Sequence, residues 1–112
     1  MTEYLNFKNT DIPIKQKINI LNETFFLEIQ YRTYDDKLVC NLYDGFGKVL
    51  GEGEKMVFGV PLFDFLYKDS LGNVNQKMPK KYIVPCTADC KICDVNLTNF
   101  STKVFLFLRD VS

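Results

Sequence analysis

The strongest constraint on the fold is the alternation of apolar and polar side chains in TFFLEIQYR, residues 24–32. Successive side chains of a β-strand point to opposite faces of the sheet. One face of this segment would therefore carry polar side chains such as Glu28 and Gln30. The opposite face would carry the apolar set, which consists of Phe25, Leu27, Ile29 and Tyr31. The alternation predicts a half-buried antiparallel strand whose apolar face lines a core.

Shorter segments on either side continue this pattern. Residues 18–20 (INI) precede the strand by three residues, which favours a hairpin with Asn22 near its tip. The polar residues 34–37 predict a turn into a second strand, residues 38–44 (LVCNLYD). The inward face of that strand would carry Leu38, Cys40 and Leu42. We therefore expect Cys40 to be a buried thiol that packs as a small apolar side chain.

Closely spaced glycines dominate the next stretch, residues 44–58 (DGFGKVLGEGEKMVF). They predict tight turns around two short strands, residues 49–50 and 56–58. A phosphate-binding loop is not expected, because no helix follows the glycines and no Lys-Ser or Lys-Thr pair closes the motif. The apolar residues of PLFDFLYK, residues 61–68, fit either one helical turn or a strand.

A polar, turn-rich segment occupies residues 68–81 (KDSLGNVNQKMPKK). Connecting segments of this kind lie on the surface and often carry binding residues. We interpret this segment as a mobile surface loop through which the chain contacts a partner. The candidate contact residues are Lys68, Asp69, Asn73, Asn75, Lys77, Lys80 and Lys81.

Three more stretches complete the strand pattern. Residues 82–85 (YIVP) and 92–97 (ICDVNL) predict strands, and residues 97–101 (LTNFS) predict a turn. Residues 103–110 (KVFLFLRD) are apolar on both faces, as expected for a central strand that is covered on both sides. About seven to eight short strands without a helical period predict an all-β fold. We expect one domain, residues 1–112, folded as an antiparallel sandwich or a partly open barrel.

Three of the four cysteines fall close together in CTADCKIC, residues 86–93. Clustered thiolates can hold an iron-sulfur cluster or, with a fourth ligand, a structural zinc ion. The candidate ligands are Cys86, Cys90, Cys93 and Cys40, with Asp89 or Asp94 as a carboxylate in place of Cys40. On the strand interpretation the sulfur atoms point in different directions and Cys40 lies in the core. We therefore interpret these cysteines as packing or loop residues and expect no metal and no other cofactor.

Composition excludes several classes of function. The absence of histidine removes the commonest general base near neutral pH and every Ser-His or Cys-His nucleophile pair, so we do not expect an enzyme. Fourteen Lys and Arg balance fourteen Asp and Glu, which leaves no net field to attract nucleic acid or an anionic membrane. The sequence shows no signal peptide and no apolar run of about 20 residues. We expect synthesis in the cytoplasm and no membrane insertion.

The order of strands and turns carries a family resemblance over nearly the whole chain, from about Tyr4 to Arg109. Its elements are a basic amino-terminal segment, a hairpin into a strand ending at Tyr31-Arg32, a strand into Tyr43-Asp44, a turn with Gly45 and Gly47, and Gly59-Val60-Pro61-Leu62. This succession resembles the baseplate plug family of contractile phage tails.

The resemblance implies a structural component of the baseplate of a contractile phage tail or a tail-like bacteriocin. Its partners would be hub, tube and other baseplate proteins, and it would be present in several symmetric copies. It would be assembled in the bacterial cytoplasm and end in the baseplate of the virion or bacteriocin particle.

Two alternative functions remain open from the sequence. A small metal-binding or iron-sulfur protein would use the cysteines named above. A β-barrel module that binds a ligand or nucleic acid would use exposed aromatic side chains such as Phe46 and Tyr67 as stacking platforms. The chain lacks the basic groove that normally accompanies such platforms.

Overall fold

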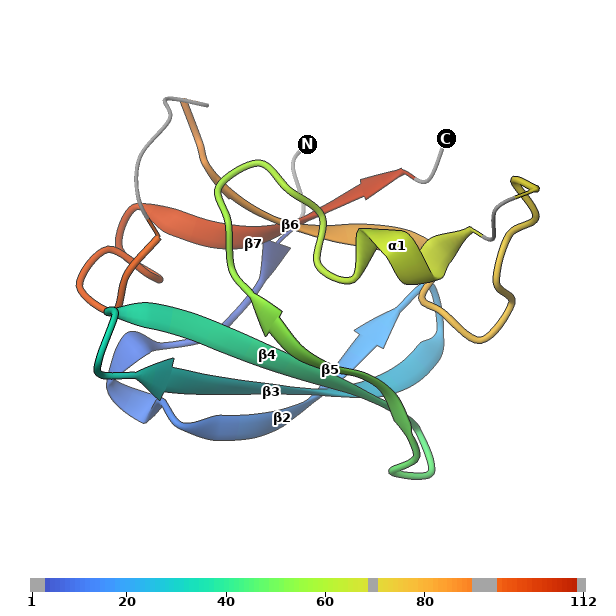
Figure 1. The fold of residues 1–112 in the computed structure, drawn as a ribbon, viewed down its shortest axis with the longest axis horizontal. Helices are drawn as coiled ribbons and strands as arrows, with labels where there is room; N and C mark the ends of the chain where they lie inside the picture. Colours follow the sequence, from blue (N-terminus) through green and yellow to red (C-terminus); the bar gives the residue numbers. More distant parts are fainter. Residues whose placement is uncertain (1–3, 69–70, 90–94, 111–112) are drawn as a thin grey trace.

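The computed structural model describes residues 4–68, 71–89 and 95–110, and it confirms the predicted all-β sandwich. Two antiparallel sheets with the strand orders β1-β7-β6 and β2-β3-β4-β5 face each other across the core (Figure 1). The strands are β1 (Tyr4–Leu5), β2 (Ile14–Ile20), β3 (Glu23–Arg32), β4 (Lys37–Asp44), β5 (Val49–Lys55), β6 (Lys81–Thr87) and β7 (Val104–Asp110). A 3-10 turn at Asn9–Asp11 and one helical turn, α1 (Asp64–Tyr67), complete the elements.

The alternating segment forms β3, and its predicted inward face is confirmed. Leu27 and Ile29 are fully buried between the sheets, while Gln30 on the opposite face is exposed. β3 pairs with β4 in a regular antiparallel register, with Ile29 opposite Cys40. Because paired residues point to the same face, this register brings Leu38, Cys40 and Leu42 into the same core, as predicted.

The first hairpin is longer than predicted. β2 begins at Ile14 rather than Ile18, and it pairs with β3 along its whole length without a register shift. The first half of the strand is not predicted because a polar side chain, Gln16, occupies an inward position and interrupts the apolar alternation. Its Nε2 donates a hydrogen bond to the backbone carbonyl of Asn6 at 3.1 Å, which satisfies the amide on the apolar face.

The prediction of two short strands separated by glycine turns is wrong. β5 runs through Gly51 and Gly53 and ends before Met56. Gly51 is buried, and a Cβ there would lie 2.6 Å from the ring of Phe63, so close packing excludes a side chain. Gly53 has a φ of +71° and lies in a β-bulge opposite Asn41, whose Oδ1 accepts a hydrogen bond from the Gly53 N–H at 2.7 Å.

The segment that follows β5 joins the two sheets and contains α1. One helical turn, not a strand, therefore accounts for the apolar residues after Pro61. Before α1, the Gly59 N–H donates to the Pro85 carbonyl and the Leu62 N–H donates to the Ile83 carbonyl, both at 2.7 Å. These bonds occupy the free edge of β6, and Figure 1 shows the segment passing from β5 to the upper sheet.

β7 is the central strand of its sheet and is covered on both faces, as predicted. Leu106 faces the core between the sheets, whereas Phe107 joins an outer cluster with Val84 and Cys86. β6 is longer than predicted and includes Lys81 and Cys86. Cys86 is therefore a strand residue rather than a loop residue.

The strand predicted for residues 92–97 is not confirmed. Residues 92–94 lie outside the described residues, and Val95, Asn96 and Leu97 belong to no strand. The turn predicted for 97–101 is present. The N–H of Asn96 donates to Asn99 Oδ1 at 3.0 Å, and the N–H of Asn99 donates to Asn96 Oδ1 at 2.9 Å. This reciprocal pair of hydrogen bonds fixes the turn that precedes β7.

Candidate partner-contact site

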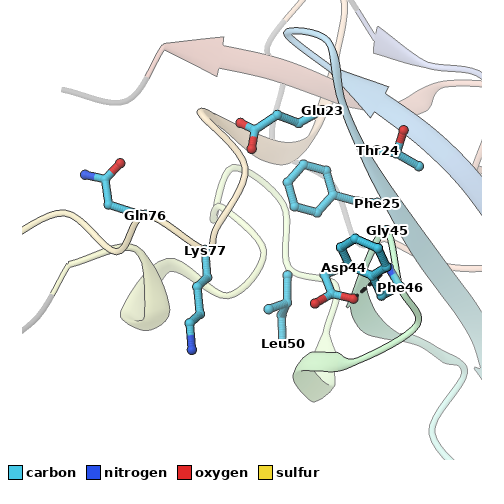
Figure 2. Close-up of a pocket in the computed structure, with 9 residues that line it drawn as sticks. All are labelled: Glu23, Thr24, Phe25, Asp44, Gly45, Phe46, Leu50, Gln76 and Lys77. Atoms are coloured by element: carbon cyan, nitrogen blue, oxygen red, sulfur yellow. Dashed lines mark hydrogen bonds between the residues drawn. The ribbon is translucent and has the colours of Figure 1, made fainter.

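An open hollow of about 430 Å³ lies at one end of the sandwich, where three segments distant in sequence meet. The first two segments are the tips of the β2–β3 and β4–β5 hairpins, and the third is part of the loop before β6. Figure 2 shows Gln76 and Lys77 on the opposite side of the hollow from Gly45 and Phe46. We call this region the tip hollow, and its lining consists of Glu23, Thr24, Phe25, Asp44, Gly45, Phe46, Leu50, Gln76 and Lys77.

Phe46 projects from a turn whose conformation is fixed by hydrogen bonds. Asp44 Oδ1 accepts bonds from the backbone N–H groups of Phe46 and Lys48, both at 2.9 Å. The N–H of Asp44 donates to the Lys48 carbonyl at 2.8 Å. On this turn the Phe46 side chain is 100% exposed. Aromatic side chains presented on rigid elements are typical anchors of protein interfaces, so Phe46 is the leading contact candidate.

The neighbouring tip exposes a second apolar side chain, Leu21. Leu21 and Asn22 form a two-residue turn with φ values of 49° and 68°, the left-handed pair that a type I′ hairpin turn requires. Asparagine tolerates this region, but leucine does not favour it. The Leu21 side chain is 59% exposed. The two tips lie side by side, since a Cβ on Gly45 would approach the Thr24 carbonyl oxygen to 3.1 Å.

The loop before β6 reaches the tip hollow through Lys77, one of the predicted contact residues. Asn75, another of them, anchors the loop to α1: its N–H donates to the Tyr67 carbonyl at 2.8 Å and its Nδ2 to the Leu66 carbonyl at 3.0 Å. Asn75 Oδ1 in turn accepts from the N–H of Lys77 at 3.0 Å. The structure thus brings Lys77 to the site and gives Asn75 a positioning role.

Two other predicted contact residues lie at a different place. Lys68 and Asn73, together with Asn75, line a separate open pocket beside Phe65, outside the tip hollow. Asp69 lies outside the described residues. The predicted contact set is therefore divided between two regions on either side of the loop.

The last two predicted contact residues interact within the chain. Lys80 Nζ donates to Gln76 Oε1 at 3.0 Å, and Lys81 Nζ forms an ion pair with Asp110 Oδ1 at 3.1 Å. Lys81 belongs to β6 rather than to the loop. The mobility expected for the loop stays a prediction.

A polar network that the sequence did not indicate covers the outer face of the β2-β3-β4-β5 sheet. Glu28 accepts hydrogen bonds from Asn41 Nδ2 and the Tyr43 hydroxyl, both at 2.8 Å. These bonds lower the pKa of Glu28, and the bond to Glu28 raises the pKa of Tyr43. Lys15 Nζ lies 3.7 Å from the centroid of the Tyr43 ring. Glu28 is thus a fixed, charged group, which suits recognition better than proton transfer.

The described cysteines lie in two separate environments. Cys40 lies in the core between the sheets, where burial, with a contribution from Glu54, raises the pKa of its thiol. Cys86 lies in the outer cluster on the far side of the β6–β7 pair. Cys90, Cys93 and Asp94 lie outside the described residues. In the described part of the chain, no group of three or more His, Cys, Asp or Glu is placed to hold a metal ion.

Of the two predicted stacking platforms, one is not available. Tyr67 is only 2% exposed, and its hydroxyl donates to the Lys81 carbonyl at 2.8 Å. Burial raises the pKa of this phenol. The prediction of a surface role for Tyr67 is therefore wrong, whereas Phe46 is a surface aromatic side chain as predicted.

Comparison with known proteins identifies one family. The family model described as Cyanophage baseplate Pam3 plug gp18 matches residues 2–111. The comparison with curated proteins found no match. Among the residues that the structure describes, no helix has both the length and the apolar character needed to cross a membrane.

Proposed function

Because the chain belongs to the Cyanophage baseplate Pam3 plug gp18 family, we propose that it is a structural subunit of the baseplate of a contractile phage tail or a tail-like bacteriocin. In this proposal several symmetric copies contact hub and tube proteins around the tail axis. The subunit is assembled into the particle in the bacterial cytoplasm, and its function depends on its surfaces rather than on catalysis.

The observation that supports docking most directly is the fully exposed ring of Phe46 beside the tip hollow. Burying a large aromatic ring is one of the larger gains that a single side chain brings to an interface. The hydrogen bonds of Asp44 hold the turn before a partner arrives, so little conformational entropy is lost on docking. Leu21 extends the apolar surface across the second tip.

Charged side chains around the apolar tips supply a polar rim. Lys77 approaches the hollow from the loop, and Glu23 lies at the start of β3. An apolar centre with a polar rim is the usual arrangement of protein interfaces. We propose that the tip hollow receives an apolar side chain of a neighbouring baseplate protein while Phe46 packs against that neighbour's surface.

Phe46→Ser tests this proposal in a strain that produces the particles. The variant should fold with an unchanged melting temperature, because Phe46 is fully exposed in the folded chain. Its amount per purified particle, measured by quantitative mass spectrometry, should fall severalfold relative to the unmodified chain.

Tyr34→Ser is the matched control. Tyr34 is also an exposed aromatic residue, 81% exposed, but it lies in the β3–β4 turn at the opposite end of the sandwich. The control should enter particles at the normal level. Normal incorporation of Phe46→Ser, or an equal loss for both variants, would contradict a contact through the tips.

A further inference from the structure

β2 presents an open sheet edge. The two-residue turn makes Ile20 and Glu23 a hydrogen-bonded pair, so Ile18 and Gln16 also bond to β3. The backbone groups of Lys15, Lys17 and Asn19 therefore point away from β3, along the plane of the sheet. None of these three residues has a backbone hydrogen bond to another segment in the described structure. An added strand could therefore form backbone hydrogen bonds with β2 at every second residue, at Lys15, Lys17 and Asn19.

The other sheet edges are short, covered or irregular. β1 has two residues, and the free edge of β6 is occupied by the Gly59 and Leu62 N–H groups. β5 has two register shifts where it pairs with β4. A bulged strand is poorly suited to pair with another strand along its free edge. β2 is regular along seven residues and is the edge best suited to strand addition.

The charges on β2 indicate which kind of segment could pair with its edge. Lys15 and Lys17 lie on the outer face, where an added strand would place side chains directly opposite them. Lys15 is already opposite Glu28 and lies over Tyr43. Lys17 is opposite Phe26, is exposed, and has no ion pair among the described residues. A partner with a carboxylate opposite Lys17 would supply the missing counter-charge.

We propose that the β2 edge binds an extended segment of another protein that carries acidic side chains at alternate positions. A second copy of this chain fits poorly, because antiparallel pairing of two β2 strands through the three open positions places Lys17 opposite Lys17. The inference goes beyond the tip contact, because it names a second site and the chemistry of its ligand. Its test uses the isolated protein, so it succeeds or fails independently of the particle experiment.

The probe is a short capped peptide of alternating valine and glutamate, and the readout is amide hydrogen exchange followed by NMR. The exchange of the Lys15, Lys17 and Asn19 amides should slow severalfold at saturating peptide. The Gln16 and Ile18 amides already bond to β3 and should change little. The matched peptide of alternating valine and lysine should give no protection at the same concentration.

Two variants locate the site. Lys17→Glu should reverse the preference, so that the lysine peptide protects the edge and the glutamate peptide does not. Lys17→Pro removes an N–H that makes no bond to β3 and should abolish protection by either peptide. Absence of protection in the unmodified chain, or equal protection by both peptides, would overturn the proposal. In that case the lysines only guard the edge against pairing.

Discussion

At the scale of single residues, Leu21 combines two unfavourable features, a left-handed backbone and an exposed apolar side chain. A residue with a Cβ pays about 1–2 kcal/mol in this backbone region, and asparagine recovers part of that cost by local hydrogen bonding. Leu21→Asn should therefore raise the free energy of unfolding by about 1 kcal/mol, measured by urea denaturation. A side chain retained at such a cost fits a role in contact rather than in folding.

Leu21→Ala is the control for this prediction. Alanine keeps the backbone strain and removes only the exposed side chain, so stability should change little. A large loss of stability in either variant would show that the Leu21 side chain supports the folded chain itself.

Glu28 predicts a pH dependence of stability. Hydrogen bonds from Asn41 and Tyr43 place the pKa of Glu28 below its ordinary value of 4.5. The ionised form therefore stabilises the fold at pH values above 4.5, and this contribution is lost as the pH falls through the lowered pKa. Glu28→Gln should reduce the free energy of unfolding by on the order of 1 kcal/mol near pH 7, because a hydrogen bond to a charged group exceeds a neutral one.

The difference between Glu28→Gln and the unmodified chain should shrink as the pH falls through the lowered pKa of Glu28. Denaturant titrations at several pH values provide the measurement. A difference that stays constant with pH would show that the charge of Glu28 does not contribute, and that only the shape of the side chain matters.

At the scale of elements, the packing of α1 on β5 depends on Gly51. A Cβ at this position would lie 2.6 Å from the Phe63 ring and 2.9 Å from Leu66 Cδ1. Phe63 has little freedom to move away, because it is buried and has a φ of 57°. Gly51→Ala should destabilise the chain by about 1–3 kcal/mol, measured as a lowered denaturation midpoint. Unchanged stability would mean that α1 can shift outward without loss.

The contact between Gly51 and α1 also shows why the sequence predicts some strands better than others. β3 and β4 can be predicted from the sequence because each has one buried face. In β3 the alternation of Leu27 and Ile29 with polar residues reveals that face from neighbouring residues alone. The sequence predicts only the first two residues of β5, because the roles of its glycines depend on distant residues. Gly51 packs against α1, and Gly53 lies in the bulge opposite Asn41. Glycine looks the same in a local pattern whether it makes a turn or permits a close approach.

The candidate site could be predicted only in its parts. The Asp44-Gly45 turn and the loop containing Lys77 are visible in the sequence, and the structure places both at the tip hollow. The turn and the loop come together because of how the chain crosses between the sheets, and residue spacing in the sequence does not reveal that crossing. The burial of Tyr67 was missed for the same reason, since the apolar residues before it fit a helix or a strand equally well.

At the scale of the whole molecule, the sandwich measures 36 × 29 × 26 Å and has no net charge. Long-range electrostatic steering therefore contributes little to its association, and short-range complementarity decides where it docks. The two surfaces proposed above are the apolar tips around Phe46 and Leu21 and the open edge of β2. The tips lie at one end of the sandwich and β2 lies at the edge of a sheet, so the two proposed contacts would not compete for the same surface.

The most direct test of the account is to quantify this chain in purified tail or bacteriocin particles. The account predicts a fixed number of copies per particle that matches the tail's rotational symmetry, with density for the chain at the baseplate in cryo-electron microscopy. It also predicts that deleting the gene reduces the number of complete particles. Particles that lack the chain, or a deletion that leaves particle number and contraction-dependent killing unchanged, would contradict it.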